Sequence, residues 1–162
     1  MNLTGSLSSE TLVEHTLESI LGESLITHGA RVIDIGSGAG FPGLPLAIQR
    51  RDLTMALAEP RYKRAAFLRH AVRELQLTNT EVLEKRAEEV GGQTFEVATL
   101  RAVGDPSSWL RTSVLIRQTG ALLAWTTRPE ALEKGLAPDF RLEACLPIPG
   151  SQLRQIAAFR RI

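Results

Sequence analysis

Residues 31–48 read RVIDIGSGAGFPGLPLAI, and this stretch decides the fold class of the chain. Residues 31–35 alternate as a short buried strand, which carries the acid Asp34 near its end. The next eight residues include four glycines, Gly36, Gly38, Gly40 and Gly43. Each glycine in a helix interior would cost about 0.8–1.0 kcal/mol relative to alanine, so the run predicts a hinge between a strand and a helix. Because glycine leaves backbone N–H groups open to a ligand, we hypothesise that a nucleotide-like cofactor binds there.

Composition limits both the fold and the classes of site. The chain has 162 residues, which is the size of one domain with a real core. Cys145 is the only cysteine, which excludes an internal disulfide and a cysteine-built zinc site, and we predict no metal site. No apolar run reaches the roughly 18 residues of a membrane span, and residues 1–10 lack a signal-peptide pattern. We expect a soluble cytoplasmic protein with a single domain over residues 1–162.

The segment before the glycine stretch predicts an amphipathic helix. Thr11 and Glu14 have the spacing of a capping box. Apolar residues share one face at helical spacing: Val13, Leu17, Ile20 and Leu21. We expect this face to cover the sheet, so that residues 1–29 form a helical cover over a core of residues 30–162. His15 and Ser19 lie one turn apart on another face, and we interpret His15 as structural or exposed.

The rest of the chain predicts alternating strands and helices. Four strands are expected, at 53–58, 80–83, 95–100 and 121–125, and three helices, at 61–75, 106–118 and 129–135. Residues 140–148 and 152–160 meet at the turn Pro149–Gly150, which requires an antiparallel hairpin. The prediction is an α/β, Rossmann-like fold: a seven-stranded, mostly parallel sheet with an antiparallel last strand and helices on both faces.

The position of one acid separates two cofactor classes that share this glycine pattern. Gly38, Gly40 and Gly43 satisfy G-x-G-x-x-G, which alone suggests a dinucleotide site. Asp34, however, lies at the entrance to the loop, where a carboxylate beside a pyrophosphate is unfavourable. S-adenosylmethionine has no phosphate, and its ammonium group would attract a carboxylate directly or through water. Asp34 therefore favours S-adenosylmethionine.

Glu59, at the end of the expected second strand, is placed to accept two hydrogen bonds from ribose hydroxyls in either cofactor class. The alternative is that Glu59 is a surface acid at a strand end. The terminal hairpin is the feature that discriminates, because a seventh strand inserted antiparallel is typical of class I methyltransferases. A nicotinamide-binding half usually ends in parallel units. We therefore predict the class I methyltransferase form of the fold.

The chain resembles the bacterial glucose-inhibited division protein B family, the small-subunit rRNA guanine-N7 methyltransferase G. The resemblance rests on segments in the correct order along most of the chain: NLTGSLSSETLVEHTLESI at 2–20, VIDIGSGAGFPGLPLAI at 32–48, KRAAFLRHAVRELQLTN at 63–79, RAEE at 86–89 and LRAV at 100–103. Phe41–Pro42–Gly43 is an extension that is uncommon among methyltransferases generally. The resemblance implies an S-adenosylmethionine-dependent enzyme acting on ribosomal RNA.

The resemblance also implies roles for single residues. The cofactor-binding set is Asp34, Gly36, Ser37, Gly38, Gly40 and Phe41 in the glycine loop, Glu59 at the ribose, and Arg86, Ala87 and Glu88 beside the adenine. Arg101 matches an arginine beside the methyl-transfer centre and is the expected catalytic residue; a surface ion pair with Asp105 is the alternative. The expected RNA-binding residues are Arg64, Arg69, Arg73, Arg128 and Arg154. Since guanine N7 has a free lone pair, no general base is needed, and positioning dominates.

Three departures from the family leave the substrate open. Members usually carry a further helical segment before the N-L-T motif, and this chain begins almost at that motif. Thr126–Thr127 and Ser151–Leu153 replace basic residues. The alternatives are a methyltransferase with another substrate, a binding or assembly module without activity, and, more distantly, a dinucleotide oxidoreductase. A homodimer is one way to bury apolar surface that a missing cover would leave exposed.

Overall fold

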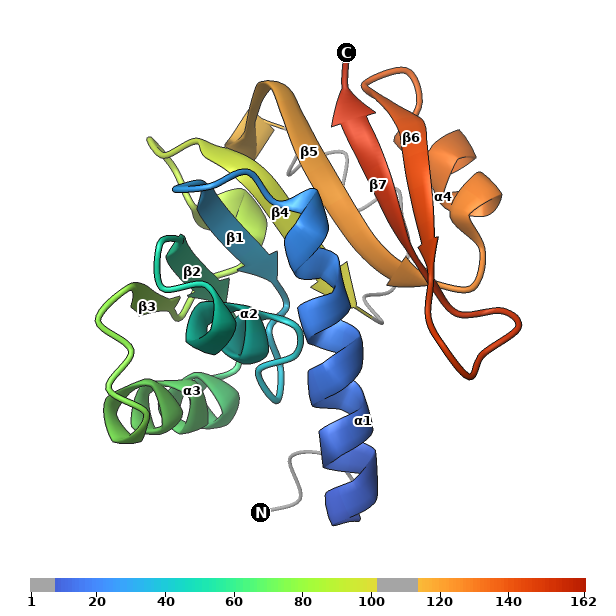
Figure 1. The fold of residues 1–162 in the computed structure, drawn as a ribbon. Coiled ribbons are helices and arrows are strands. Elements are labelled where there is room, and N and C mark those ends of the chain that lie inside the picture. The colour runs from blue at the N-terminus through green and yellow to red at the C-terminus, as the bar shows by residue number, and fades with distance from the viewer. Residues whose placement is uncertain (1–7, 102–113) are drawn as a thin grey trace.

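The computed structural model describes residues 8–101 and 114–162 (Figure 1). In this part of the chain, seven strands form one sheet in the order β3-β2-β1-β4-β5-β7-β6. The strands are β1 Arg31–Ile35, β2 Thr54–Ala58, β3 Thr80–Leu83, β4 Phe95–Arg101, β5 Ile116–Thr126, β6 Phe140–Pro147 and β7 Gln155–Arg161. Strands β1 to β5 pair in parallel, and β7 pairs antiparallel with both β5 and β6. The predicted fold class is confirmed, including the hairpin that inserts its last strand.

Helices pack on both faces of the sheet. They are α1 Ser9–Ile20, η1 Leu21–Leu25, α2 Gly43–Gln49, α3 Tyr62–Glu74, η2 Ala87–Glu89 and α4 Pro129–Leu136, of which η1 and η2 are 3₁₀ helices. On one face, Leu46 of α2 and Leu68 of α3 pack with Val32 of β1 in one buried cluster. On the other face, Leu132 and Leu136 of α4 join a second cluster. The central strands are thus buried on both sides, as parallel strands require. No helix among the described residues is long and apolar enough to cross a membrane.

The predicted helix at 106–118 is wrong at its end, after residues 114–115, which are in 3₁₀ conformation. Its first part lies outside the described residues, and Ile116–Gln118 form the beginning of β5. Ile116 pairs with Phe95 of β4, and its side chain is 1% exposed. Pairing with a distant strand buries Ile116 where the local pattern suggested one more helical turn, so tertiary contacts override the local signal.

Helix α1 differs from the prediction at its start and in its buried face. Its N-cap is Ser8, whose side chain accepts the N–H of Thr11 at 3.2 Å, so the cap lies three residues before the expected capping box. Glu18 and Ser19 are the buried residues of α1, whereas Val13 and Leu17 are 58% and 61% exposed. The face expected to cover the sheet therefore faces outward over much of its length.

A close approach to Trp125 explains this orientation of α1. A Cβ on Gly22 would lie 2.7 Å from the Trp125 ring, so only glycine allows the contact. The indole N–H of Trp125 donates to the backbone oxygen of Glu18 at 2.8 Å. His15, Glu18, Ser19 and Gly22 follow the i, i+3, i+4, i+7 spacing of one helix face. This face, made of polar and small residues, is the one that packs inward.

Candidate functional site

The candidate site lies at the carboxyl edge of the sheet, at the neighbouring strands β1 and β4. The strand order reverses between these two neighbours, and open α/β sheets bind ligands at such a reversal. Figure 1 shows the amino-terminal half of α1 extending past the arrowheads of β1, β4 and β5 at this edge. The site is therefore framed by the loops after β1, β2 and β3, by the end of β4 at Arg101 and by α1.

The glycine loop is held against the end of β2 by its own backbone. The N–H groups of Gly36 and Ser37 both donate to the backbone oxygen of Ala58, at 2.9 and 3.1 Å. The Ser37 hydroxyl donates to the backbone oxygen of Asp34 at 3.0 Å, which tightens the turn. Gly40 has φ +96°, a conformation that side-chain-bearing residues rarely adopt. The loop is therefore a fixed surface of backbone, with Phe41 half-buried where it leads into α2.

Asp34 has an internal role that sequence reasoning missed. Asp34 is only 1% exposed. Its Oδ1 atom accepts a hydrogen bond from the Thr99 hydroxyl at 2.8 Å, and its Oδ2 atom accepts one from the Gly43 N–H at 3.3 Å. The carboxylate thus joins β1, β4 and the start of α2. Burial raises its pKa to about 6, against the lowering effect of these hydrogen bonds. A carboxylate this deeply buried is not open to direct contact with a ligand's ammonium group, and attraction through water stays a prediction.

Glu59 binds the glycine loop and the next loop at once. It is 3% exposed; Oε2 accepts the Gly38 N–H at 3.0 Å and Oε1 the Arg61 N–H at 2.9 Å. Each carboxylate oxygen has two lone pairs, so each can accept one further hydrogen bond. Glu59 is therefore not the surface acid of the alternative interpretation. Its predicted contacts with two ribose hydroxyls fit the acceptor capacity that is left.

The segment Arg86–Glu88 follows β3, whose last residue, Leu83, contacts Glu59. The Glu59 N–H donates to the backbone oxygen of Leu83 at 3.0 Å, which places the ends of β2 and β3 side by side. Arg86 is the N-cap of η2, and its N–H donates to Glu89 at 2.9 Å. Ala87 is buried, whereas Arg86 and Glu88 are exposed. The small Ala87 side chain and the ordered backbone around it are what the predicted adenine site needs.

Arg101, at the end of β4, is directed toward α1. Its Nη2 atom lies 2.8 Å from Glu18 Oε2 and 2.5 Å from His15 Nδ1, and its Nη1 atom donates to the backbone oxygen of His15 at 3.4 Å. The expected alternative partner, Asp105, lies outside the described residues. Glu18 is 4% exposed and also forms an ion pair through Oε1 with Arg154, although this contact lacks hydrogen-bond geometry. Arg101 therefore belongs to a charge cluster of His15, Glu18, Arg101 and Arg154, in which Glu18 is buried and the other three side chains are partly exposed.

The arginines expected to bind RNA divide into paired and unpaired residues. Arg69 pairs with Glu84 at 2.9 Å, Arg73 with Glu74 at 3.4 Å, and Arg154 with Glu14 at 2.8 Å as well as with Glu18. Arg64 and Arg128 form no ion pair with any residue in the described ranges 8–101 and 114–162. A guanidinium nitrogen of Arg64 lies 3.7 Å from where a Cβ on Gly38 would be, so this side chain lies against the glycine loop.

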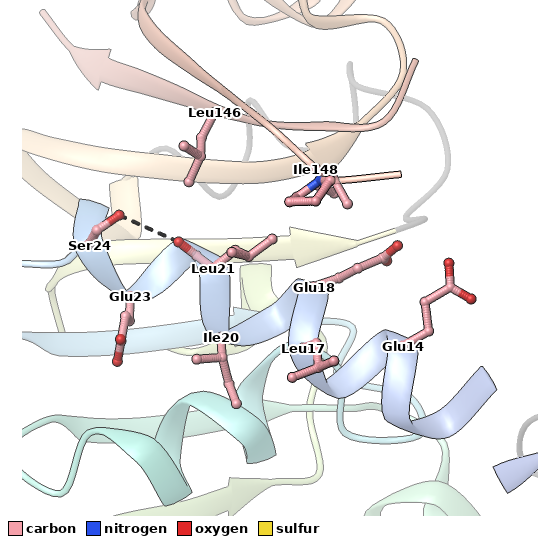
Figure 2. A pocket seen from close by; sticks show the side chains of 10 residues that line it. Glu14, Leu17, Glu18, Ile20, Leu21, Glu23, Ser24, Leu146 and Ile148 are labelled. Carbon is pink, nitrogen blue, oxygen red and sulfur yellow. Dashed lines mark hydrogen bonds between the residues drawn. The ribbon is translucent and has the colours of Figure 1, made fainter. Parts of the chain in front are cut away.

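A surface groove of about 610 Å³ adjoins the charge cluster (Figure 2). Leu17 and Ile20 of α1 and Leu21 of η1 line one side, and Leu146 and Ile148 line the other. Glu14 and Glu18 lie toward one end of the groove. Part of the apolar stripe of α1 therefore lines this groove between α1–η1 and the β6–β7 turn, instead of covering the sheet.

Comparison with known proteins places the chain in a family. A family model described as rRNA small subunit methyltransferase G matches residues 1–134. A ribosomal RNA small subunit methyltransferase G from Chloroflexus aggregans is 36% identical over 99% of this chain and 74% of its own length. Proteins of the same name from Mycobacterium leprae and Trichormus variabilis are 46% and 42% identical over 68% and 61% of this chain. The chain spans only 46% and 42% of those two relatives.

Solved structures agree on the fold. A SAM-dependent methyltransferase from Aquifex aeolicus superposes with a TM-score of 0.73 at 16% identity, covering 96% of this chain and 94% of that one. TrmN from Thermus thermophilus superposes with a TM-score of 0.75 at 18% identity, covering 95% of this chain and 53% of that one. The chain has the fold of these methyltransferases and belongs to the rRNA small subunit methyltransferase G family.

Proposed function

We propose that the chain is an S-adenosylmethionine-dependent methyltransferase that methylates N7 of a guanine in small-subunit ribosomal RNA. One observation supports S-adenosylmethionine as the cofactor. Glu59, at the end of β2, accepts the Gly38 N–H, and each of its two carboxylate oxygens can accept one further hydrogen bond. The family of the chain supports the reaction and the acceptor.

The residues present fit S-adenosylmethionine. The loop of Gly36, Ser37, Gly38, Gly40 and Phe41 would lie along the methionine part, Glu59 would accept the ribose hydroxyls, and Arg86, Ala87 and Glu88 would flank the adenine. The buried Asp34 would add a negative charge behind the loop. A pyrophosphate at the same place would face both Asp34 and Glu59, which argues against a dinucleotide cofactor.

The main requirement of this reaction is that the protein aligns guanine N7 with the methyl group. The bound cofactor supplies a methyl group on a sulfonium: as the bond from N7 forms, the sulfur–carbon bond breaks and its electron pair stays on sulfur. The base carries the positive charge afterwards, so no proton is moved in this step. The residues around the site have only to hold N7 in line and to exclude water. The charge cluster at the end of β4 contributes to the acceptor side of this alignment.

The unpaired arginines are the best-placed contacts for RNA phosphates. Arg128 is exposed after β5 and Arg64 is half-buried beside the glycine loop. Log affinity falls with log salt concentration, and a protein that neutralises one phosphate fewer has a slope that is less negative by about 1. Arg128→Ala is expected to make the slope for binding of small-subunit rRNA less negative, whereas Arg69→Ala changes it less because Glu84 already pairs with Arg69. Equal slopes for both variants and the unaltered chain would show that Arg128 does not contact an RNA phosphate.

Titration with two cofactors separates the main classes of function. Calorimetry of the full chain with S-adenosylmethionine is expected to give saturable binding, and NAD is expected to give none. Transfer of a labelled methyl group to unmodified 30S subunits and to free 16S rRNA then tests the acceptor. Binding of NAD in place of S-adenosylmethionine would contradict the proposal.

A second candidate is a family member that binds the cofactor but acts on another substrate or serves as a binding or assembly module. The observation that favours it is the pairing of Arg154 with Glu14 and Glu18, since this arginine was expected to face RNA. Cofactor binding without methyl transfer to either rRNA form would favour this candidate. A cytoplasmic location and a homodimer stay predictions, and sedimentation of the chain tests the homodimer.

A further inference from the structure

His15 joins the two elements on either side of the strand-order reversal. Its Nδ1 atom lies 2.5 Å from Arg101 at the end of β4, and its ring centroid lies 5.7 Å from that of Phe41 in the loop after β1. The two rings are tilted by 56°. The His15 side chain is 25% exposed, so it is fixed on two sides and still open to solvent. This position lies between the predicted cofactor loop and the expected acceptor side.

The contact with Arg101 defines the tautomer of His15. A guanidinium has only donors, so Nδ1 of His15 must accept, and the proton of the neutral ring lies on Nε2. Burial, followed by the charge of Arg101, lowers the pKa of His15, while Glu18 and Glu14 oppose this and Arg154 adds to it. The ring is therefore neutral near pH 7 and carries one N–H donor, on Nε2. No hydrogen bond to Nε2 is formed by residues 8–101 or 114–162.

Arg101 itself is poorly placed to donate a hydrogen bond to the acceptor base. Nη2 is shared between Glu18 and His15, Nη1 is directed at the His15 backbone, and the side chain is only 17% exposed. Glu18 is fixed in turn by Arg154. Arg101 and Glu18 therefore hold the imidazole ring, and the ring presents the open donor.

We propose that the Nε2–H group of His15 recognises the carbonyl oxygen of the acceptor base, and that Arg101 and Glu18 are positioning residues for His15. The inference rests on the proposed function and identifies the group that would form a hydrogen bond with the base. On the Hoogsteen edge of guanine, O6 and N7 are both acceptors. A single donor on O6 leaves the N7 lone pair free to attack the methyl group. Adenine carries an amino donor at the place of O6, so the same N–H selects guanine against adenine.

Two near-isosteric substitutions separate recognition from structural support. The amide nitrogen of Gln reaches the place of Nε2, and the amide of Asn reaches the place of Nδ1. His15→Gln is expected to stay within about threefold of the unaltered chain in KM for 16S rRNA, and His15→Asn to raise KM at least about tenfold, the loss of one good hydrogen bond. A purely structural His15 predicts the reverse order, and that result, or two unaffected variants, would overturn the proposal.

If both variants are impaired, an rRNA with a modified base at the methylated position tests the proposal. In 2-aminopurine the O6 atom is absent and N7 is kept. Small-subunit rRNA with 2-aminopurine at the methylated position is expected to be at least about tenfold poorer than guanine for the unaltered chain. His15→Ala and Glu18→Gln are expected to lower this preference. If His15→Ala retained the full preference for guanine, His15 would not contact O6.

Cofactor titration keeps failure of this inference distinct from failure of the proposed function. Each His15 variant is expected to bind S-adenosylmethionine with the affinity of the unaltered chain, because His15 acts on the acceptor. An unaltered chain without cofactor binding or methyl transfer would contradict the proposed function. An active unaltered chain with an indifferent His15 would contradict only the inference.

Discussion

Glu18 and Arg101, 83 residues apart in the sequence, form a buried ion pair with Nη2 2.8 Å from Oε2. The Glu18 side chain is 5% exposed and that of Arg101 is 17% exposed. A charged side chain this deep in a helix face is tolerated only when it is paired. The pair therefore fixes α1 on the end of β4, and with it the position of His15.

Removing the charge of Glu18 tests this anchoring. Glu18→Gln keeps the size of the side chain but leaves Arg101 buried beside a neutral amide, which is expected to lower the free energy of unfolding by about 3 kcal/mol. Urea denaturation measures the change. Glu14→Gln is the matched control, because Glu14 pairs with the same Arg154 at the surface and is expected to change stability little. Equal effects of the two substitutions would contradict the anchoring role.

Gly43 tests the packing between the glycine loop and Asp34. A Cβ at Gly43 would lie 2.4 Å from Leu57 Cδ2 and 2.7 Å from Asp34 Oδ2. Gly43→Ala is therefore expected to destabilise the fold by about 1–3 kcal/mol and to weaken cofactor binding. Gly91→Ala is the control, since a Cβ there meets nothing within 4 Å. A Gly43→Ala protein as stable as Gly91→Ala in urea would show that the loop has more room than the structure gives it.

Asp34 predicts a pH dependence of stability. Its pKa is raised from 3.8 to about 6 in the folded protein, so the folded state holds the proton more tightly than the unfolded chain. The favourable contribution is present at low pH and is lost as pH rises through this window, by roughly 2 kcal/mol between about pH 4.5 and about pH 7.5. Asp34→Asn removes this term. The unfolding free energies of the two proteins, measured in urea across this range, are expected to diverge, and parallel curves would contradict the raised pKa.

Glu59 predicts a loss of cofactor affinity without loss of the fold. In Glu59→Gln, one carboxylate oxygen becomes an amide donor, which cannot accept both a backbone N–H and a ribose hydroxyl. Affinity for S-adenosylmethionine is expected to fall by about 10–100-fold in calorimetry, the range of one to two hydrogen bonds to a charged group. Glu81→Gln on the exposed side of β3 is the control and is expected to bind normally. A Glu59→Gln protein that binds as tightly as Glu81→Gln would remove Glu59 from the site.

Much of the fold could be predicted from local pattern. The glycine hinge, the continuous apolar strand 53–58 and the Pro149–Gly150 turn each specify an element through its own residues. The beginning of β5 could not be predicted in this way, because Ile116 is a strand residue only through its pairing with Phe95. The orientation of α1 depended in the same way on Trp125, more than 100 residues away.

The candidate site was predictable in its position but not in its connections. Asp34 and Glu59 were identified as acids beside the loop, yet their backbone partners, Gly43 and Gly38, follow only from the folded chain. His15 was interpreted as structural or exposed, and its contact with Arg101 spans 86 residues. One local signal was available: His15, Glu18, Ser19 and Gly22 share a helix face, and small residues on such a face permit close packing. That signal marks an inward face even where the apolar stripe lies elsewhere.

Nucleoside analysis of the methylated RNA tests the central claim most directly. Unmodified 30S subunits and free 16S rRNA would each be incubated with the full chain and S-adenosylmethionine, then digested to nucleosides and analysed by mass spectrometry. The account predicts 7-methylguanosine in at least one of the two RNAs, in an amount that depends on the chain and is reduced by Glu59→Gln. A chain that binds S-adenosylmethionine but forms no 7-methylguanosine in either RNA would contradict the account.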